Sequence, residues 1–241
     1  MQPSVNAAGG ALPTRLVLVG PGRLGRSLAI GLRALVLTGA GDVFCAGGDL
    51  GPGASEGMLA QHQGRRLFAS TLGAMLRGPV PIVAAVNGDA LGGGFGLVAA
   101  AHLVVTDERA HFATPELKLG LFPWMIAPVL LRNLPRKVVY DLILTGRRLP
   151  APDAHALGFA NRLAPPGEAL ELAVELARQV SAWSPAVVAM GLEALAMVDD
   201  LDVDRAMAHM HSQLSVNLML EDAGEGISAF LARRPPQWKG R

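Results

Sequence analysis

The sequence predicts an α/β fold with mainly parallel strands, followed by a helical C-terminal third. Short apolar runs of strand character alternate with helix-like segments through the first half, and the pattern from residue 128 onward is helical. Such alternation is typical of parallel sheets whose connecting helices cover the faces. With 241 residues, 51% of them hydrophobic, the chain is long enough for one large domain or for a core with a small appendage.

The first half contains strand-like and helix-like segments in turn. Strands are expected at residues 15–19, 34–38, 82–86 and 102–106. Helices are expected at residues 24–32, 58–76 and 91–101. Val, Leu, Ile and Ala dominate the strand runs, a composition that suits strands buried on both faces of a parallel sheet.

The last part of the chain is expected to form helices at residues 138–145, 151–157, 169–183, 184–200, 202–220 and 227–233. Ser184, which precedes a proline, and Asp202 are typical helix starts. The glycines within residues 222–226 predict a break before the last short helix.

Three consecutive glycines, Gly92, Gly93 and Gly94, join a strand-like run to a helix-like run. Because glycine lacks a Cβ, such a turn presents backbone N–H groups and the positive end of a helix dipole to a ligand oxygen. A second loop of small residues, CAGGD at residues 45–49, follows an earlier strand. Amides from two such loops predict an oxyanion hole, which stabilises negative charge that develops on an oxygen.

The charge balance and the cysteine content limit which binding partners and which cellular compartment are expected for this chain. Lys and Arg total 21 against 20 Asp and Glu, and this net charge of +1 indicates neither a nucleic-acid nor a membrane-surface partner. The single cysteine, Cys45, excludes an internal disulfide and suits the cytoplasm. Residues 1–10 do not look like a secretory signal, and polar residues and glycines interrupt the longest apolar stretch, 80–105, so no membrane span is expected.

Three other features leave more than one interpretation open. Glu116 precedes an apolar run, where desolvation would raise its pKa and suit it to proton transfer, but an exposed surface glutamate fits the residues alone as well. The segment GPGRLG at residues 20–25 has the context of a dinucleotide-binding turn, yet no acidic residue ends the next strand, so a tight turn is favoured. His102 and His111 have no second ligand at metal spacing and are expected to be structural, and no metal site is predicted.

Five segments resemble the enoyl-CoA hydratase/isomerase (crotonase) superfamily, and the resemblance covers residues 33–241. They read RALVLTGAGDVFCAGGDL, PIVAAVNGDALGGGFGL, FATPELKLGLFP, LTGRRLPAPDAHALGFANRLAP and ISAFLARRPPQWKGR. The resemblance implies a crotonase (ClpP-like) fold, with a spiral core of repeated ββα-type units and a helical C-terminal trimerisation region. The start at residues 1–13 is expected to be disordered, ahead of a core at 14–180 whose segment 14–32 is atypical and an oligomerisation region at 181–241.

The resemblance also implies a substrate and its site. An acyl-CoA thioester would bind with its carbonyl oxygen between the backbone amides of Ala46 and Gly93, while Glu116 moves a proton. Coenzyme A is then part of the substrate, and no further cofactor is expected. The acyl-CoA site is expected to involve Gly47, Gly48, Asp49, Gly92, Gly94, Trp124 and Lys239. A homotrimer or dimer of trimers is expected, in which Phe230 and Lys239 approach CoA from a neighbouring protomer.

Departures from the family pattern bear on the choice of reaction. Family hydratases use two glutamates, and the position of the first, after the triple glycine, is Gly96 here, so only Glu116 remains. A large indole, Trp124, stands in the segment PWMI, where typical hydratases carry small residues. One carboxylate suffices to move a proton between two carbons, as in the family's Δ3,Δ2-enoyl-CoA isomerases. Isomerisation and hydration of an enoyl-CoA are both expected reactions, with isomerisation favoured by mechanism.

The N-terminal segment supports two alternatives from other functional classes. Residues 15–32 do not resemble the start of family members, which contributes to the CoA phosphate site. The segment fits either a rebuilt βαβ start in which Arg23 or Arg26 substitutes at the phosphates, or a fusion or gene-model artefact. Together with the missing glutamate, this leaves open a catalytically weak or silent member that binds acyl-CoA or forms oligomers. An NAD(P)-binding protein that uses residues 20–25 is the other alternative.

Overall fold

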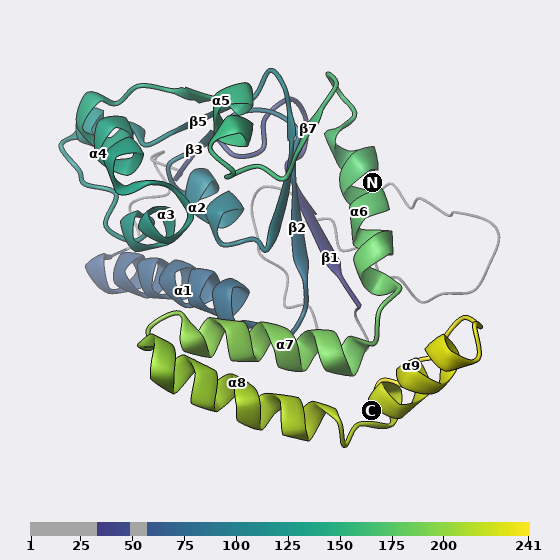
Figure 1. Cartoon of the computed structure of the whole chain (residues 1–241). Helices are drawn as coiled ribbons and strands as arrows, with labels where there is room; N and C mark the ends of the chain where they lie inside the picture. The colour runs from purple at the N-terminus through teal and green to yellow at the C-terminus, as the bar shows by residue number, and fades with distance from the viewer. Residues whose placement is uncertain (1–32, 49–56) are drawn as a thin grey trace.

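Two β-sheets form the centre of the protein in the computed structural model, which describes residues 33–48 and 57–241 (Figure 1). Within these residues the larger sheet has the strand order β1-β2-β4-β7, and all its pairs are parallel. Its strands are β1 (Leu35–Thr38), β2 (Ile82–Val86), β4 (Leu103–Asp107) and β7 (Arg162–Ala164). The smaller sheet has the order β3-β5-β6, with strands β3 (Ala90–Leu91), β5 (His111–Ala113) and β6 (Leu149–Pro150). There β3 is parallel to β5, and β5 is antiparallel to β6.

Helices cover both faces of the larger sheet. They are α1 (Met58–Arg77), α2 (Gly93–Ala99), the 3₁₀ helix η2 (Pro115–Leu119), α3 (Ala127–Asn133), α4 (Arg136–Thr145), α5 (Ala151–Ala156), α6 (Ala169–Ser181), α7 (Pro185–Val198), α8 (Val203–Asn217) and α9 (Glu221–Leu231). Helix α6 packs on β1, β2 and β4, whereas α2 and α3 lie on the other side of the sheet (Figure 1). Helices α7 and α8 lie side by side, and α9 follows them. Across the described residues, no single helix has the length and apolar composition to cross a membrane; only α6 and α7 taken together, at 103° to each other, do.

The core consists of two apolar layers, one on each face of the larger sheet. Strand side chains alternate between the faces, because successive residues of a strand point in opposite directions. Val36 and Val83 are buried with the alanines of α6, whereas Leu37 and Ala84 are buried in the other layer. That second layer contains three rings whose centroids lie 5.3 to 5.4 Å apart, those of Phe95, Phe112 and Phe159. It is also the layer against which the glycine-rich turn is built.

Most of the expected elements within the described residues are present near the expected positions. The strands expected at 34–38, 82–86 and 102–106 are β1, β2 and β4, each displaced by no more than one residue. Helices α1 and α4 to α8 begin and end within three residues of their expected bounds. The strand expected at 15–19, the helix at 24–32 and the glycine turn at 20–25 lie outside the described residues.

Two helix boundaries differ from the expectation. Helix α2 begins at Gly93, not at residue 91, because Ala90 and Leu91 pair with β5 as a short strand. Helix α9 is unbroken, so the predicted break at residues 222–226 is wrong. A glycine inside a helix costs about 0.5–1 kcal/mol, but Gly226 lets a ring pack closely, since a Cβ there would lie 3.2 Å from the Trp238 ring. This tertiary contact offsets the low helix propensity.

The last residues of the chain fold back onto α9 and onto the junction between α6 and α7. Asp222 is 1% exposed, and its carboxylate accepts the Ser184 hydroxyl at 2.5 Å and the Lys239 and Gly240 N–H groups at 2.6 and 2.9 Å. The Trp238 indole N–H donates to a carbonyl of the α6–α7 junction at 2.8 Å. The C-terminal segment is therefore a fixed part of the helical region.

Candidate active site

The triple-glycine turn joins β3 to α2 and needs glycine at two of its positions. Gly92 donates its N–H to the Ala113 carbonyl at 2.9 Å and has φ +53°, a conformation that other residues rarely adopt. A Cβ on Gly94 would lie 2.5 Å from the Cβ of Cys45. Gly93 is the first residue of α2, so its N–H has no acceptor within the helix. The turn therefore presents a backbone donor at the positive end of the α2 dipole.

The loop at residues 45–48 lies against this turn. Cys45 forms a parallel β-bridge with Ala90. Gly47 has φ +107°, and its Cα lies 3.8 Å from the point where Gly92 would carry a Cβ. The structure therefore brings the two predicted loops together, with Ala46, Gly47 and Gly48 on one side and Gly92, Gly93 and Gly94 on the other. Asp49, also predicted for this site, lies outside the described residues.

The Glu116 side chain reaches the same turn from η2. Its Oε1 lies 3.1 Å from the point where Gly92 would carry a Cβ. Its Oε2 is buried, and none of the described residues donates a hydrogen bond to it. Burial disfavours the charged form and raises the pKa of Glu116 above its ordinary value. The carboxylate is half-buried, so the interpretation as an exposed surface glutamate is wrong.

Local sequence explains why the chain turns at Glu116. Pro115 begins η2 with a fixed φ, and Gly120 ends it in the left-handed conformation at φ +72°. Thr114, just before the turn, is buried, and its hydroxyl donates to the Leu142 carbonyl of α4 at 3.2 Å. Strand β5 on one side and α4 on the other thus fix the segment that carries the carboxylate.

The remaining predicted residues are largely exposed. Trp124 is 74% exposed and packs against Phe122 with the rings tilted at 48° and their centroids 4.8 Å apart. Phe230 of α9 is 82% exposed, and the Lys239 ammonium pairs with the Glu221 carboxylate at 3.2 Å. Helix α9 lies well away from α2 and α3 in Figure 1. One chain by itself therefore does not bring Phe230 or Lys239 to Glu116.

Asp89 connects the loops of the site, and sequence reasoning did not assign it a role. Its backbone carbonyl accepts the N–H groups of Phe44 and Cys45, both at 3.1 Å. Its carboxylate accepts the His111 N–H at 3.0 Å and an Arg148 N–H at 2.8 Å. The signal in the sequence was a polar residue within an apolar run, three residues before the glycines.

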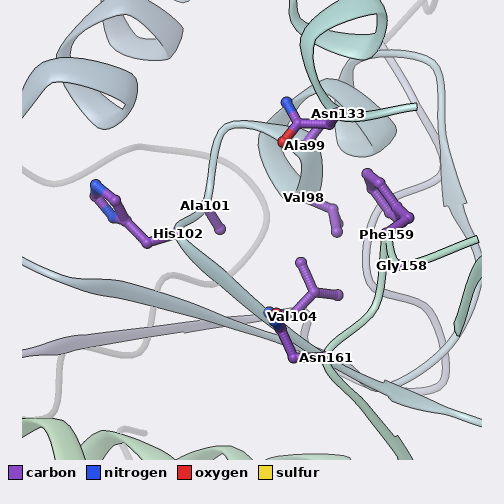
Figure 2. A pocket seen from close by; sticks show the side chains of 9 residues that line it. All are labelled: Val98, Ala99, Ala101, His102, Val104, Asn133, Gly158, Phe159 and Asn161. Carbon is purple, nitrogen blue, oxygen red and sulfur yellow. Dashed lines mark hydrogen bonds between the residues drawn. The ribbon is translucent and has the colours of Figure 1, made fainter. Parts of the chain in front are cut away.

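A small cavity of about 90 Å³ lies beside the C-terminal end of α2 (Figure 2). Its wall includes His102 and Asn161, whose polar atoms serve the backbone: His102 Nδ1 accepts the Ile82 N–H at 3.1 Å, and Asn161 Oδ1 accepts the Val104 N–H at 2.7 Å. Burial lowers the pKa of His102. With His111 held by a carboxylate, both histidines have the structural roles that the sequence indicates. The described part of the chain contains no cluster of three His, Cys, Asp or Glu side chains that would hold a metal ion.

Comparison with known proteins gives matches over most of the chain. The family model described as enoyl-CoA hydratase/isomerase matches residues 30–241. Carnitinyl-CoA dehydratase from Salmonella arizonae is 39% identical over 216 residues, which cover 87% of this chain and 82% of that protein. A solved enoyl-CoA hydratase from Polaromonas sp. JS666 matches with a TM-score of 0.85 and 29% identity over 95% of this chain and 98% of that one. A solved enoyl-CoA hydratase from Mycobacterium tuberculosis H37Rv has a TM-score of 0.77 and 36% identity over 88% and 82% of the two chains.

Proposed function

This chain belongs to the enoyl-CoA hydratase/isomerase (crotonase) family and has its fold, and on that premise we propose that it converts an enoyl-CoA thioester through an enolate, with Glu116 as the acid–base group. One observation carries the proposal: the partly buried Glu116 carboxylate, with one oxygen unpartnered, faces the turn that presents the Gly93 N–H. A carboxylate of raised pKa beside backbone donors suits proton transfer at a carbon conjugated to a carbonyl.

The proposed mechanism uses the two loops and the carboxylate in one proton shuttle. The thioester oxygen accepts hydrogen bonds from the Gly93 N–H and from an amide of the loop at residues 46–48, which the family resemblance assigns to Ala46. Glu116 removes a proton from the α or γ carbon, and the C–H electron pair shifts toward the thioester oxygen to form the enolate. Losing one such donor costs about 3–4 kcal/mol of transition-state stabilisation. Coenzyme A enters with the substrate, and the proposed chemistry needs no other cofactor.

Two reactions fit this enolate. The relatives carry the names enoyl-CoA hydratase and carnitinyl-CoA dehydratase, which favour addition or removal of water. Gly96, where the family pattern has a second carboxylate, favours movement of the double bond instead. Both reactions share the enolate and Glu116, so one variant tests the common step.

The test is a paired assay on trans-2-hexenoyl-CoA and trans-3-hexenoyl-CoA, with wild type beside Glu116→Gln. We expect double-bond migration by the wild type and a loss of about 100-fold or more in the variant, because general acid–base catalysis contributes about 10²–10⁴-fold. Binding of hexanoyl-CoA to both proteins, measured by calorimetry, is the control for an intact pocket. Equal turnover by the wild type and the variant, or acyl-CoA binding without turnover, would contradict the mechanism. Either result would favour a catalytically weak or silent family member that binds acyl-CoA.

We further propose that the chain assembles as a trimer or a dimer of trimers. Support comes from the large apolar side chains that a single chain leaves exposed on α8 and α9 and at their ends: Met207, Leu214, Leu218, Met219, Ile227, Phe230 and Leu231. A groove of about 480 Å³ between α7 and α9 adds Trp183 and Val188 to this surface. Assembly through it would place Phe230 and Lys239 against a neighbouring protomer, as the CoA site proposed for them requires.

A further inference from the structure

The Asn87 side chain binds the segment at residues 39–43, which leads from β1 to the first loop of the candidate site. Asn87 follows the last residue of β2. Its Oδ1 accepts the Gly39 N–H at 3.1 Å. Its Nδ2 donates to the Gly41 carbonyl at 2.7 Å and lies 3.5 Å from the Val43 carbonyl. One side chain therefore holds the segment near both of its ends.

The two kinds of partner explain why an amide side chain is needed at position 87. A backbone N–H only donates and a backbone carbonyl only accepts, so the side chain must supply an acceptor to Gly39 and a donor to Gly41. Asparagine supplies both, whereas a carboxylate supplies acceptors alone. The backbone adds a steric contact, because a Cβ on Gly88 would lie 2.1 Å from the Asp42 carbonyl oxygen. The segment therefore lies directly against the end of β2.

The contacts continue from this segment to the candidate site. The Phe44 and Cys45 N–H groups both donate to the Asp89 carbonyl at 3.1 Å. The Cys45 carbonyl then accepts the Leu91 N–H at 2.9 Å, immediately before the triple-glycine turn. Residues 39–45 are thus held along residues 87–91, and they end where the loop at residues 46–48 begins.

From these contacts we infer that Asn87 is a positioning residue of the enolate step, which sets where the loop at residues 46–48 places its amide against the thioester oxygen. This inference rests on the proposed function, in which that amide and the Gly93 N–H share the oxygen. A backbone donor stabilises the developing charge only when it lies about 3 Å from the oxygen. Loss of the Asn87 hydrogen bonds should therefore weaken enolate formation more than it weakens acyl-CoA binding.

The wild-type protein gives the first test without any substitution. Amide hydrogen exchange, followed by mass spectrometry of peptides that cover residues 39–45, measures how firmly the segment is held. We expect the Gly39, Phe44 and Cys45 amides to exchange about ten-fold or more slowly than in an unstructured peptide. Exchange of these amides at the unstructured rate would overturn the inference.

The second test replaces the side chain and measures enolate formation by exchange of the α protons of hexanoyl-CoA in D₂O. Asn87→Asp keeps an acceptor for Gly39 but loses the donor to Gly41, and Asn87→Ala loses both without adding a charge. Each should slow the exchange by about ten-fold or more, because complete loss of one oxyanion donor costs about 10²–10³-fold. The Kd of hexanoyl-CoA should change by less than about three-fold.

Asn133→Asp is the matched control for these variants. The Asn133 Nδ2 donates to the Val129 carbonyl at 2.8 Å within α3, so the substitution removes the same kind of hydrogen bond away from the two loops. It should keep the wild-type rate of α-proton exchange. An equal loss of rate in Asn133→Asp and Asn87→Asp would overturn the inference.

Infrared difference spectroscopy of bound hexanoyl-CoA, labelled with ¹³C at the thioester carbon, separates positioning from proton transfer. Hydrogen bonds from the two amides lower the carbonyl stretching frequency, so the Asn87 variants should return it toward the value of free hexanoyl-CoA. Glu116→Gln should leave the frequency lowered while it loses the exchange. Folded Asn87 variants with wild-type exchange and frequency would overturn the inference and leave the proposed function intact. Wild type with neither α-proton exchange nor turnover would overturn the proposed function itself.

Discussion

Glu116 Oε2 and His209 Nε2 are the buried side-chain atoms that lack a hydrogen-bond partner among the described residues. Leaving a buried polar atom unpartnered costs about 1–3 kcal/mol. At Glu116 the same feature leaves one carboxylate oxygen available for the proton transfer of the proposed mechanism. The residue therefore combines a cost in stability with the reactivity that the proposed mechanism requires.

At this residue we predict a pH-dependent gain in stability on Glu116→Gln. Burial raises the pKa of Glu116 above its value in the unfolded chain, so the unfolded state releases the proton first. The wild-type protein consequently loses stability as pH rises from the ordinary carboxyl pKa through the raised one. The neutral variant should melt at a higher temperature at pH 7, and the difference should shrink toward pH 4. Thermal melts across this range measure it, and a difference that does not change with pH would contradict the prediction.

At the scale of elements, the short strands β3 and β5 hold the loops of the site together through Asp89. The Asp89 carbonyl holds Phe44 and Cys45, just before the loop at residues 46–48. Its carboxylate holds the His111 N–H at the start of β5, and Glu116 follows three residues after β5 ends. The Asp89 backbone thus holds the segment before the loop at residues 46–48, and the Asp89 carboxylate holds the start of the strand that leads to Glu116.

We predict that Asp89→Ala lowers kcat by about ten-fold or more while KM for the enoyl-CoA changes by less than about three-fold, because small displacements of catalytic groups cost up to about 100-fold in rate. Asp89→Asn keeps an acceptor for the His111 N–H and should retain more of the activity. The exposed Asp199, which pairs with Arg132 on the surface, supplies a control in Asp199→Ala. Equal losses of kcat in the Ala and Asn variants would show that the acceptor does not position the site.

At the scale of the whole molecule, the apolar surface of α8 and α9 is the strongest evidence for assembly. A large exposed apolar patch is more often a protein–protein interface than a surface that stays in contact with solvent. Phe230, 82% exposed in one chain, has little packing to lose within its own chain, so its substitution tests assembly without unfolding the monomer. Lys239 would reach a CoA site only if the proposed trimer places a neighbouring protomer beside it.

We predict that the wild type sediments as a trimer or hexamer, and that Phe230→Asp shifts it toward monomers because a charge would be buried at the interface. Leu144→Asp replaces a leucine of α4 that is 69% exposed and serves as the matched control. Analytical ultracentrifugation at micromolar concentration gives the mass of each. A monomeric wild type, or equal dissociation by both substitutions, would argue against this surface as the interface.

How much the sequence predicts depends on whether a feature is local. The strands β1, β2 and β4 and the long helices were predicted because each has its own apolar pattern over several residues. The segments β3, β6, β7 and α3 were not expected, because two to seven residues carry too little pattern. The three short strands form through pairing with distant parts of the chain. The unbroken α9 was missed for a related reason, since Trp238 stabilises it from outside the helix.

The sequence by itself determined the fold class, the two loops of small residues and the single glutamate, Glu116, that is expected to act with them. Glycine runs and apolar strands act through backbone sterics and local periodicity, which can be read one segment at a time. Only the tertiary structure decided that Glu116 is partly buried with one oxygen unpartnered, that Asp89 joins the loops, and that the segment at residues 39–43 fills the space beside Gly88. Burial and steric exclusion are properties of atoms brought together from distant parts of the chain, and no single segment contains them.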